Sequence, residues 1–152
     1  MTQKDKPIVR IGNAQGFWGD RLSASASLIQ QQPDLDYITL DYLAEVSLSI
    51  MAIQREKNPQ EGYAKDFIET IRSLIPFWLK GSRVKIVTNA GGLNPLACAK
   101  ACRDLLNSNG CETLKIGVVD GDDVISLLKK NAECHFFKNL DTQESVLILF
   151  HK

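Results

Sequence analysis

The chain is poor in the groups that the commonest catalytic motifs require. Only two histidines, His135 and His151, occur among 152 residues, and neither lies in a loop predicted to border a site. No serine stands in a G-x-S-x-G sequence and no cysteine has a histidine nearby, which disfavours nucleophilic triad chemistry. The dinucleotide fingerprint G-x-G-x-x-G and the G-K-[ST] of a Walker A loop are also missing.

The chain also lacks net charge and long apolar runs. Its 18 Lys and Arg residues balance 18 Asp and Glu residues, whereas a nucleic-acid or membrane-surface partner needs a basic excess. No apolar run approaches the length of a membrane span, and the polar segment 1–7 leads directly into a predicted strand without a secretory signal. We therefore expect a cytoplasmic protein with no nucleic-acid and no membrane partner. With 44% hydrophobic residues, residues 1–152 are expected to form a single domain around one core.

The four cysteines show no C-x-x-C spacing. Cys98 and Cys102 are four apart on a predicted helix and share one face, but both histidines lie far along the chain. A metal pair there is conceivable; the favoured interpretation is reduced, small apolar side chains at a helix–sheet interface. The sequence thus predicts no metal site.

Strands and helices alternate along the chain. Apolar, β-branched runs predict strands at 8–12, 37–41, 84–88 and 114–119, and a short run at 146–150 is a candidate fifth strand. Helical periodicity predicts helices at 20–32, 43–53, 64–79, 95–109 and 124–130, with Leu43, Val46, Ile50 and Ile53 on one stripe of the second. This order predicts an α/β fold: an open, mostly parallel sheet of four to five strands with helices on both faces, a Rossmann-like three-layer sandwich.

The carboxyl ends of parallel strands lie at one edge of a sheet, where ligands bind. The loops after the first four predicted strands should therefore converge into one cleft. Their polar and glycine residues are Asn13, Asp20 and Arg21; Asp41 and Tyr42; Asn89, Gly91, Gly92 and Asn94; and Asp120 and Asp122.

The first loop carries the spacing G-x-x-x-G-x-x-G at Gly12, Gly16 and Gly19. A phosphate or carboxylate at the following helix N-terminus is physically reasonable, and a tight turn that simply needs glycine explains the spacing equally well. Phe17 and Trp18 either plug the end of the sheet, which we favour, or line the pocket of an apolar ligand. The residues assigned to ligand binding in this part of the chain are Gly12, Asn13, Gly16 and Arg21.

Asp41 ends the second strand, where it is expected to cap the next helix. The functional alternative is a carboxylate that faces the cleft and acts as a general base if desolvation raises its pKa. Glu45 lies one turn further on the same side, although a solvated helix start explains both acids. The residues assigned to catalysis are Asp20, Asp41 and Asn89.

The segment from Asn89 to Pro95 makes the stronger case. Gly91 and Gly92 allow close approach of the backbone to a ligand, and nearby N–H groups could hold an oxyanion such as a thioester enolate or a phosphate. Asn94 at the cap and Pro95 at the first helical position also describe an ordinary helix start, and both interpretations can hold together. The acidic turn at 120–123 suggests Mg²⁺, but a capping turn before the next helix is preferred.

Four ordered segments resemble the amino-terminal part of the acyclic terpene utilisation protein A (AtuA) family. They are residues 11–20 (IGNAQGFWGD), 36–45 (DYITLDYLAE), 62–67 (GYAKDF) and 88–95 (TNAGGLNP). The resemblance implies a link to the degradation of acyclic terpenoids such as citronellol and geraniol, which proceeds through coenzyme A thioesters. Members of the family are much longer, so the chain is similar to the N-terminal portion of such a protein: a fragment, or a short relative.

We therefore expect an AtuA-like domain that binds an acyl-CoA or a branched carboxylate along the strand-end cleft. Its chemistry would be lyase- or hydratase-like at the thioester, with Asp41 as base and the Gly91–Gly92 turn as oxyanion site. No cofactor is expected beyond the CoA part of the substrate. Two alternatives remain open: a nucleotide-binding module, and a non-catalytic scaffold that pairs with a second copy, another subunit or a missing C-terminal region.

Overall fold

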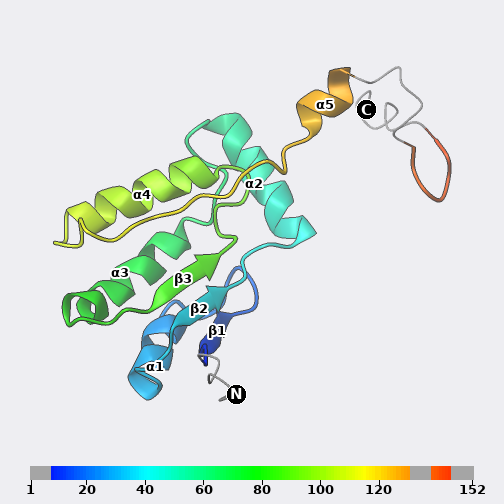
Figure 1. Cartoon of the computed structure of the whole chain (residues 1–152). Coiled ribbons are helices and arrows are strands. Elements are labelled where there is room, and N and C mark those ends of the chain that lie inside the picture. The colour runs from blue at the N-terminus through cyan, green and yellow to red at the C-terminus, as the bar shows by residue number, and fades with distance from the viewer. Residues whose placement is uncertain (1–7, 131–137, 145–152) are drawn as a thin grey trace, which may run out of the picture. The chain divides into compact units, whose positions relative to one another are not determined.

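The computed structural model describes residues 8–130 and 138–144, and the chain divides after Val118 into two units that are described separately. The helices and strands of the described residues are labelled in Figure 1 and are given below for each unit. The first unit contains β1 (Ile11–Gln15), α1 (Ala24–Gln31), β2 (Tyr37–Leu40), α2 (Glu45–Lys57), α3 (Asp66–Leu79), β3 (Lys85–Thr88) and α4 (Pro95–Asn107). The second contains α5 (Ile125–Lys130). That the whole chain is one domain stays a prediction.

The three strands form an open parallel sheet in the order β1-β2-β3. Ile38 at the centre of β2 lies opposite Gly12 on one side and Ile86 on the other, and Leu40 lies opposite Thr88. The predicted α/β class and parallel pairing are therefore confirmed. All three strands end at the same edge.

The predicted fourth strand, 114–119, is not part of the sheet. Leu114 and Ile116 still pack against the core, but the carbonyl oxygen of Leu114 accepts a hydrogen bond from Arg103 Nη1 at 2.6 Å. At Leu114 the backbone acceptor is therefore bonded to a side chain of α4 and not to a neighbouring strand. The candidate fifth strand, 146–150, lies outside the described residues.

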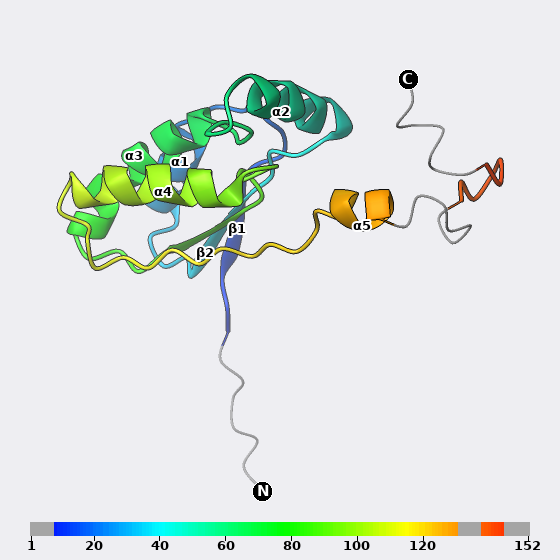
Figure 2. The same cartoon turned by 90° about the horizontal axis from the view of Figure 1, so that it is seen from above.

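Helices α1, α3 and α4 lie on one face of the sheet (Figures 1 and 2). When strands are added in one direction, right-handed connections place every crossover on the same side, which explains the single layer. On the other face, Ile11 of β1 and Val87 of β3 are exposed. Residues 8–118 therefore form two layers, and the second helical layer of the predicted sandwich is absent from them.

Strand β1 begins three residues later than predicted and ends at Gln15, after an irregularity between Asn13 and Gln15. Asn13, predicted in the turn, consequently lies inside the strand, and Gly12, predicted at the strand end, lies near its start. A Cβ on Gly12 would come within 2.6 Å of Leu28 Cδ2, so the missing side chain allows α1 to pack closely. The glycine that suggested a loop instead serves helix–sheet packing.

Helix α2 turns a different face inward from the one its apolar stripe suggests. Ser47 and Met51 are buried, whereas Val46, Ile50 and Ile53 are 72%, 43% and 53% exposed. None of the helices in residues 8–130 has the length and apolarity of a membrane span.

Candidate functional site

The loops that follow β1, β2 and β3 meet at the carboxyl edge of the sheet, as predicted. The backbone N–H of Asp41 donates to the carbonyl of Gln15 at 3.1 Å, which joins the ends of β2 and β1. The N–H of Tyr42 donates to Asn89 Oδ1 at 2.8 Å, which joins the ends of β2 and β3. The fourth predicted loop, 120–123, belongs to the second unit, and its convergence with the others stays a prediction.

Asp41 is held as a carboxylate by two hydrogen bonds. Asn89 Nδ2 donates to its Oδ1 at 2.7 Å and the N–H of Leu43 donates to the same atom at 3.1 Å. The bond from Asn89, followed by that from Leu43, holds the pKa of Asp41 below its ordinary value, while slight burial acts in the opposite direction. A general base working near neutral pH needs a raised pKa, so this geometry favours a hydrogen-bonding role for Asp41 over proton abstraction.

The start of α2 has a local cap. Ser47 Oγ accepts from the N–H of Ala44 at 2.6 Å and donates to the carbonyl of Ala44 at 2.8 Å. Asp41 therefore orders the turn before the helix through Leu43, while Ser47 serves the helix start itself. Glu45 is exposed in the first turn, as expected for a solvated helix start.

In the β1–α1 loop, the carboxylate of Asp20 occupies the backbone donors that were predicted to bind an external anion. Its Oδ2 accepts from the N–H of Gly16 at 2.7 Å and from the N–H of Phe17 at 3.3 Å. The neighbouring Arg21 is exposed, and its guanidinium has no hydrogen bond or ion pair within the described ranges. Asp20 is thus engaged by the loop backbone, and the guanidinium of Arg21 is the charged group of this loop that is left to contact a ligand.

Phe17 and Trp18 take different positions. Trp18 packs half-buried against the core, and its Nε1 donates to Asp66 Oδ1 in the first turn of α3 at 2.7 Å. Phe17 is 58% exposed. The plug interpretation thus fits Trp18, while the ring of Phe17 stays at the surface. Asp66 was missed by the sequence analysis, although an acidic side chain opening a helix is a possible partner for a nearby indole N–H.

The Gly91–Gly92 turn is closed by contacts within the chain. The N–H of Gly92 donates to the carbonyl of Asn89 at 3.0 Å, and that of Leu93 donates to the carbonyl of Gly62 at 2.9 Å. Gly92 has φ +50°, and a Cβ there would overlap Met51 Sδ. These glycines admit neighbouring parts of the protein, and an oxyanion role for the turn stays a prediction.

Both the oxygen and the nitrogen of the Asn94 side-chain amide form hydrogen bonds within the chain. Its Oδ1 accepts from the N–H of Ala97 at 3.3 Å, which confirms the predicted cap with Pro95 at the first helical position of α4. Its Nδ2 donates to the carbonyls of Pro59 and Glu61, each at 2.9 Å. The side chain therefore fastens the α2–α3 connection to the start of α4.

Asn13 points toward β2 from the uncovered side of the sheet, where its amide bonds with Thr39 Oγ1 at 3.0 Å. It lies two residues before the strand end. Its assignment to ligand binding stays a prediction.

Buried polar side chains lie between the carboxyl edge of the sheet and α3. Tyr42 is 1% exposed, its hydroxyl lies 3.3 Å from Thr70 Oγ1, and burial raises its pKa. Its ring meets that of Phe67 edge-on, with centroids 5.8 Å apart. Gln15, also buried, donates from Nε2 to the carbonyl of Asp20 at 3.5 Å. Gln15 and Thr70 were not predicted as site residues, because nothing in their spacing indicates that α3 packs against these loops.

The cysteines described by the structure are part of the core. Cys98, Cys102 and Cys111 are buried and free, as the packing interpretation predicts. The hydrogen bond with Cys102 and burial raise the pKa of the Cys98 thiol. Within residues 8–130 and 138–144, no group of three or more His, Cys, Asp or Glu side chains is placed to hold a metal ion. Asp123 Oδ1 accepts from the N–H of Ile125 at 3.1 Å, the capping geometry preferred for the acidic turn.

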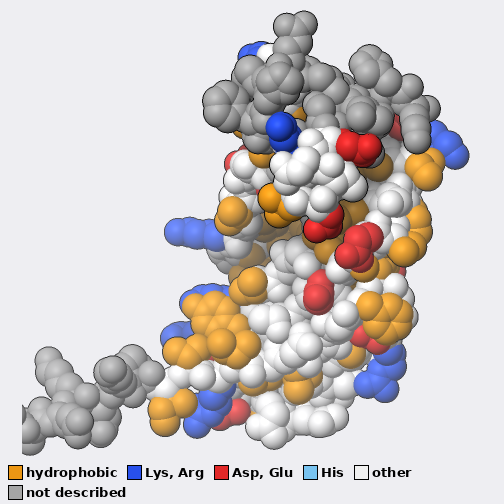
Figure 3. Space-filling model, turned by 90° about the vertical axis from the view of Figure 1, so that its right-hand side faces the viewer, with side chains coloured by type: hydrophobic (Ala, Val, Ile, Leu, Met, Phe, Trp, Pro, Cys, Tyr) orange, Lys and Arg blue, Asp and Glu red, His pale blue; other side chains and the backbone are white. Residues whose placement is uncertain are grey.

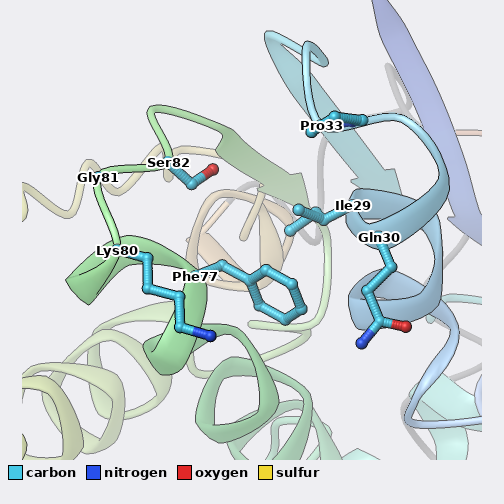
Figure 4. Close-up of a pocket in the computed structure, with 7 residues that line it drawn as sticks. All are labelled: Ile29, Gln30, Pro33, Phe77, Lys80, Gly81 and Ser82. Atoms are coloured by element: carbon cyan, nitrogen blue, oxygen red, sulfur yellow. The ribbon is translucent and has the colours of Figure 1, made fainter.

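A groove of about 370 Å³ lies away from these loops, between the ends of α1 and α3 (Figure 4). Both helices end there just before β2 and β3 begin, so the groove marks the amino edge of the sheet. Its lining residues are Ile29, Gln30, Pro33, Phe77, Lys80, Gly81 and Ser82. None of them was predicted as a site residue.

The family model described as acyclic terpene utilisation family protein AtuA matches residues 9–149. No curated protein and no solved structure matches the chain.

Proposed function

Because the chain belongs to the acyclic terpene utilisation family AtuA, we propose that it binds a branched acyl-CoA or the corresponding carboxylate at the carboxyl edge of its sheet. The family is linked to acyclic terpene utilisation, and the edge is where ligands of parallel α/β sheets bind. The proposed location is the cytoplasm. We propose no cofactor other than the CoA part of the substrate.

The observation that carries this proposal is the guanidinium of Arg21, which has no hydrogen bond or ion pair with the part of the chain that the structure describes. Asp20, the adjacent acid, is committed to the N–H groups of Gly16 and Phe17 and leaves Arg21 without a neutralising partner in the loop. An exposed guanidinium binds carboxylate and phosphate through charge-assisted hydrogen bonds. Arg21 is therefore the proposed contact for the anionic part of the ligand.

The proposed reaction is lyase- or hydratase-like at the thioester. With its pKa lowered by Asn89, Asp41 is ionised near neutral pH and is a weak base. We therefore assign it the task of accepting a hydrogen bond from a water or a hydroxyl of the ligand. In this scheme Asn89 is a positioning residue, since it holds Asp41 Oδ1.

Calorimetric titration with citronellyl-CoA tests the proposal. Arg21→Ala is expected to weaken binding by about tenfold or more, since one charge-assisted contact is lost. Arg83→Ala is the matched control: this exposed arginine precedes β3, at the opposite edge of the sheet. Absence of binding by the unmodified chain, or equal losses in both variants, contradicts the proposal. Stabilisation by NAD or ATP but not by CoA in a thermal-shift assay would favour a nucleotide-binding module instead.

A second candidate function is a non-catalytic scaffold. The exposed apolar side chains of Val46, Ile50 and Ile53, spaced three and four residues apart on α2, favour it, as do Ile11 and Val87 on the sheet face that no described helix covers. On the face seen in Figure 3, hydrophobic side chains reach the surface in several separate groups. If this function holds, light scattering after size exclusion should show self-association that Ile50→Glu abolishes and Leu96→Glu, an exposed apolar position on α4, leaves intact.

A further inference from the structure

The β1–α1 loop presents an exposed aromatic ring on a fixed backbone. Phe17 is 58% exposed, yet its own N–H and that of Gly16 are both held by Asp20 Oδ2. The next residue, Trp18, is fastened to Asp66 of α3 through its indole nitrogen at 2.7 Å. The backbone at Phe17 and the side chain that follows it are thus held in place, while the Phe17 side chain itself is exposed.

Gly19 completes this arrangement. Its φ of +123° is a conformation that favours glycine, and a Cβ there would lie 3.1 Å from Cε2 of the Phe17 ring. The ring therefore lies against the backbone of Gly19, which limits its rotation. An aromatic side chain held in this way loses little conformational entropy when a ligand packs against it.

The neighbours of Phe17 define the chemistry of a complementary ligand. Leu22 is also exposed, and the unpaired guanidinium of Arg21 lies between the two apolar side chains in the sequence. Since Asp20 is engaged within the loop, no free carboxylate of this segment opposes a bound anion. The loop therefore offers an apolar surface for a branched chain and a positive charge for an anionic group.

We propose that Phe17 is the specificity-determining residue of the site, taking the branched apolar chain of the ligand against its ring while Arg21 takes the anionic group. This inference rests on the proposed function. It separates the two parts of recognition: Phe17 provides affinity for the acyl chain, and Arg21 provides affinity that does not depend on that chain.

The test compares the affinities of citronellyl-CoA and free CoA by calorimetric titration of the full chain. Phe17→Ala is expected to weaken citronellyl-CoA by about tenfold and free CoA by less than about twofold, whereas Phe17→Tyr should retain most of the affinity. Leu79→Ala, at a 60% exposed position where α3 ends, is the matched control and should change neither affinity. Far-UV circular dichroism checks that each variant keeps its fold.

A second variant acts on the ring without removing it. Gly19→Ala strains the backbone and pushes against Phe17, so it should reduce the preference for citronellyl-CoA over free CoA in the same direction.

The outcomes separate the two proposals. If the unmodified chain binds citronellyl-CoA and Phe17→Ala binds it equally well, or loses both ligands equally, Phe17 does not determine specificity and the proposed function stands. If the unmodified chain binds no acyl-CoA, both proposals fail.

Discussion

The amide of Asn94 makes three hydrogen bonds, to Ala97, Pro59 and Glu61, and so holds two segments together. Asn94→Ala removes a helix cap and leaves two carbonyls without their donor. We expect the free energy of unfolding to fall by about 1–3 kcal/mol. Urea denaturation followed by circular dichroism measures this change.

The matched control for Asn94 is Ser49→Ala. Ser49 is exposed on α2 and its hydroxyl donates to the carbonyl of Glu45 within the same helix at 2.9 Å. Its loss should change the stability by less than about 0.5 kcal/mol. An equal effect of both substitutions would show that Asn94 does not join the two segments in solution.

Asp41 makes stability depend on pH in a defined direction. Its pKa is lower in the folded chain than the ordinary value of 3.8, so the ionised form adds stability above that pH. This stability is lost as the pH falls through the folded-state pKa. The difference in unfolding free energy between the unmodified chain and Asp41→Asn should therefore be constant near neutral pH and shrink below about pH 4. Denaturation curves that show a growing difference at low pH would contradict the geometry around Asn89.

At the scale of elements, the Gly91–Gly92 turn couples α2 to the end of β3. Gly92→Ala places a Cβ against Met51 Sδ and 3.0 Å from the carbonyl oxygen of Gly62, at a φ of +50°. We expect a loss of about 1–3 kcal/mol of unfolding free energy, because both the backbone strain and the overlap must be relieved.

Gly117→Ala is the control for Gly92. A Cβ on Gly117 meets nothing within 4 Å, and its φ lies outside the left-handed region. Its stability should match or slightly exceed that of the unmodified chain. Thermal denaturation of the two variants side by side distinguishes a general effect of replacing glycine from the specific contact with Met51.

Local chemistry made some elements predictable from the sequence. Asn94 followed by Pro95 fixed the start of α4, and Pro33 marked the end of α1 to within two residues. The inward face of α2 was not predictable, because Met51 packs against Gly92, which lies 41 positions later in the sequence. Likewise, 114–119 has a strand-like sequence, but nothing in that sequence indicates that Arg103 of the preceding helix donates to the carbonyl of Leu114.

In the candidate site, too, some features follow from the sequence and others depend on contacts between distant residues. Parallel pairing is enough to bring the loops after β1, β2 and β3 to one edge, so their convergence followed from the order of the elements. Sequence spacing did not reveal that Asp20 binds the loop N–H groups or that Asn89 holds Asp41. A polar side chain can serve a ligand or its own fold, and only the three-dimensional contacts distinguish these.

At the scale of the molecule, the sheet and its core lie within the first unit, which ends at Val118. Leu114 and Ile116 near its end still pack against that core. A chain ended after Val118 is therefore expected to keep a cooperative thermal transition within about 5 °C of that of the full chain. A chain ended after Ser108 is the comparison and should unfold earlier, since it also lacks the buried Cys111. Equal transitions for both shortened chains would contradict this division.

The bare side of the sheet has a topological consequence. Strands β1, β2 and β3 follow one another in a single direction, and no strand of residues 8–130 or 138–144 pairs with the outer edge of β1. A parallel strand joining that edge from beyond β3 must return across the sheet, and a right-handed return path runs over the side without helices. A strand added in this way would extend the sheet at β1, and its connection would cover the exposed Ile11 and Val87 at the same time.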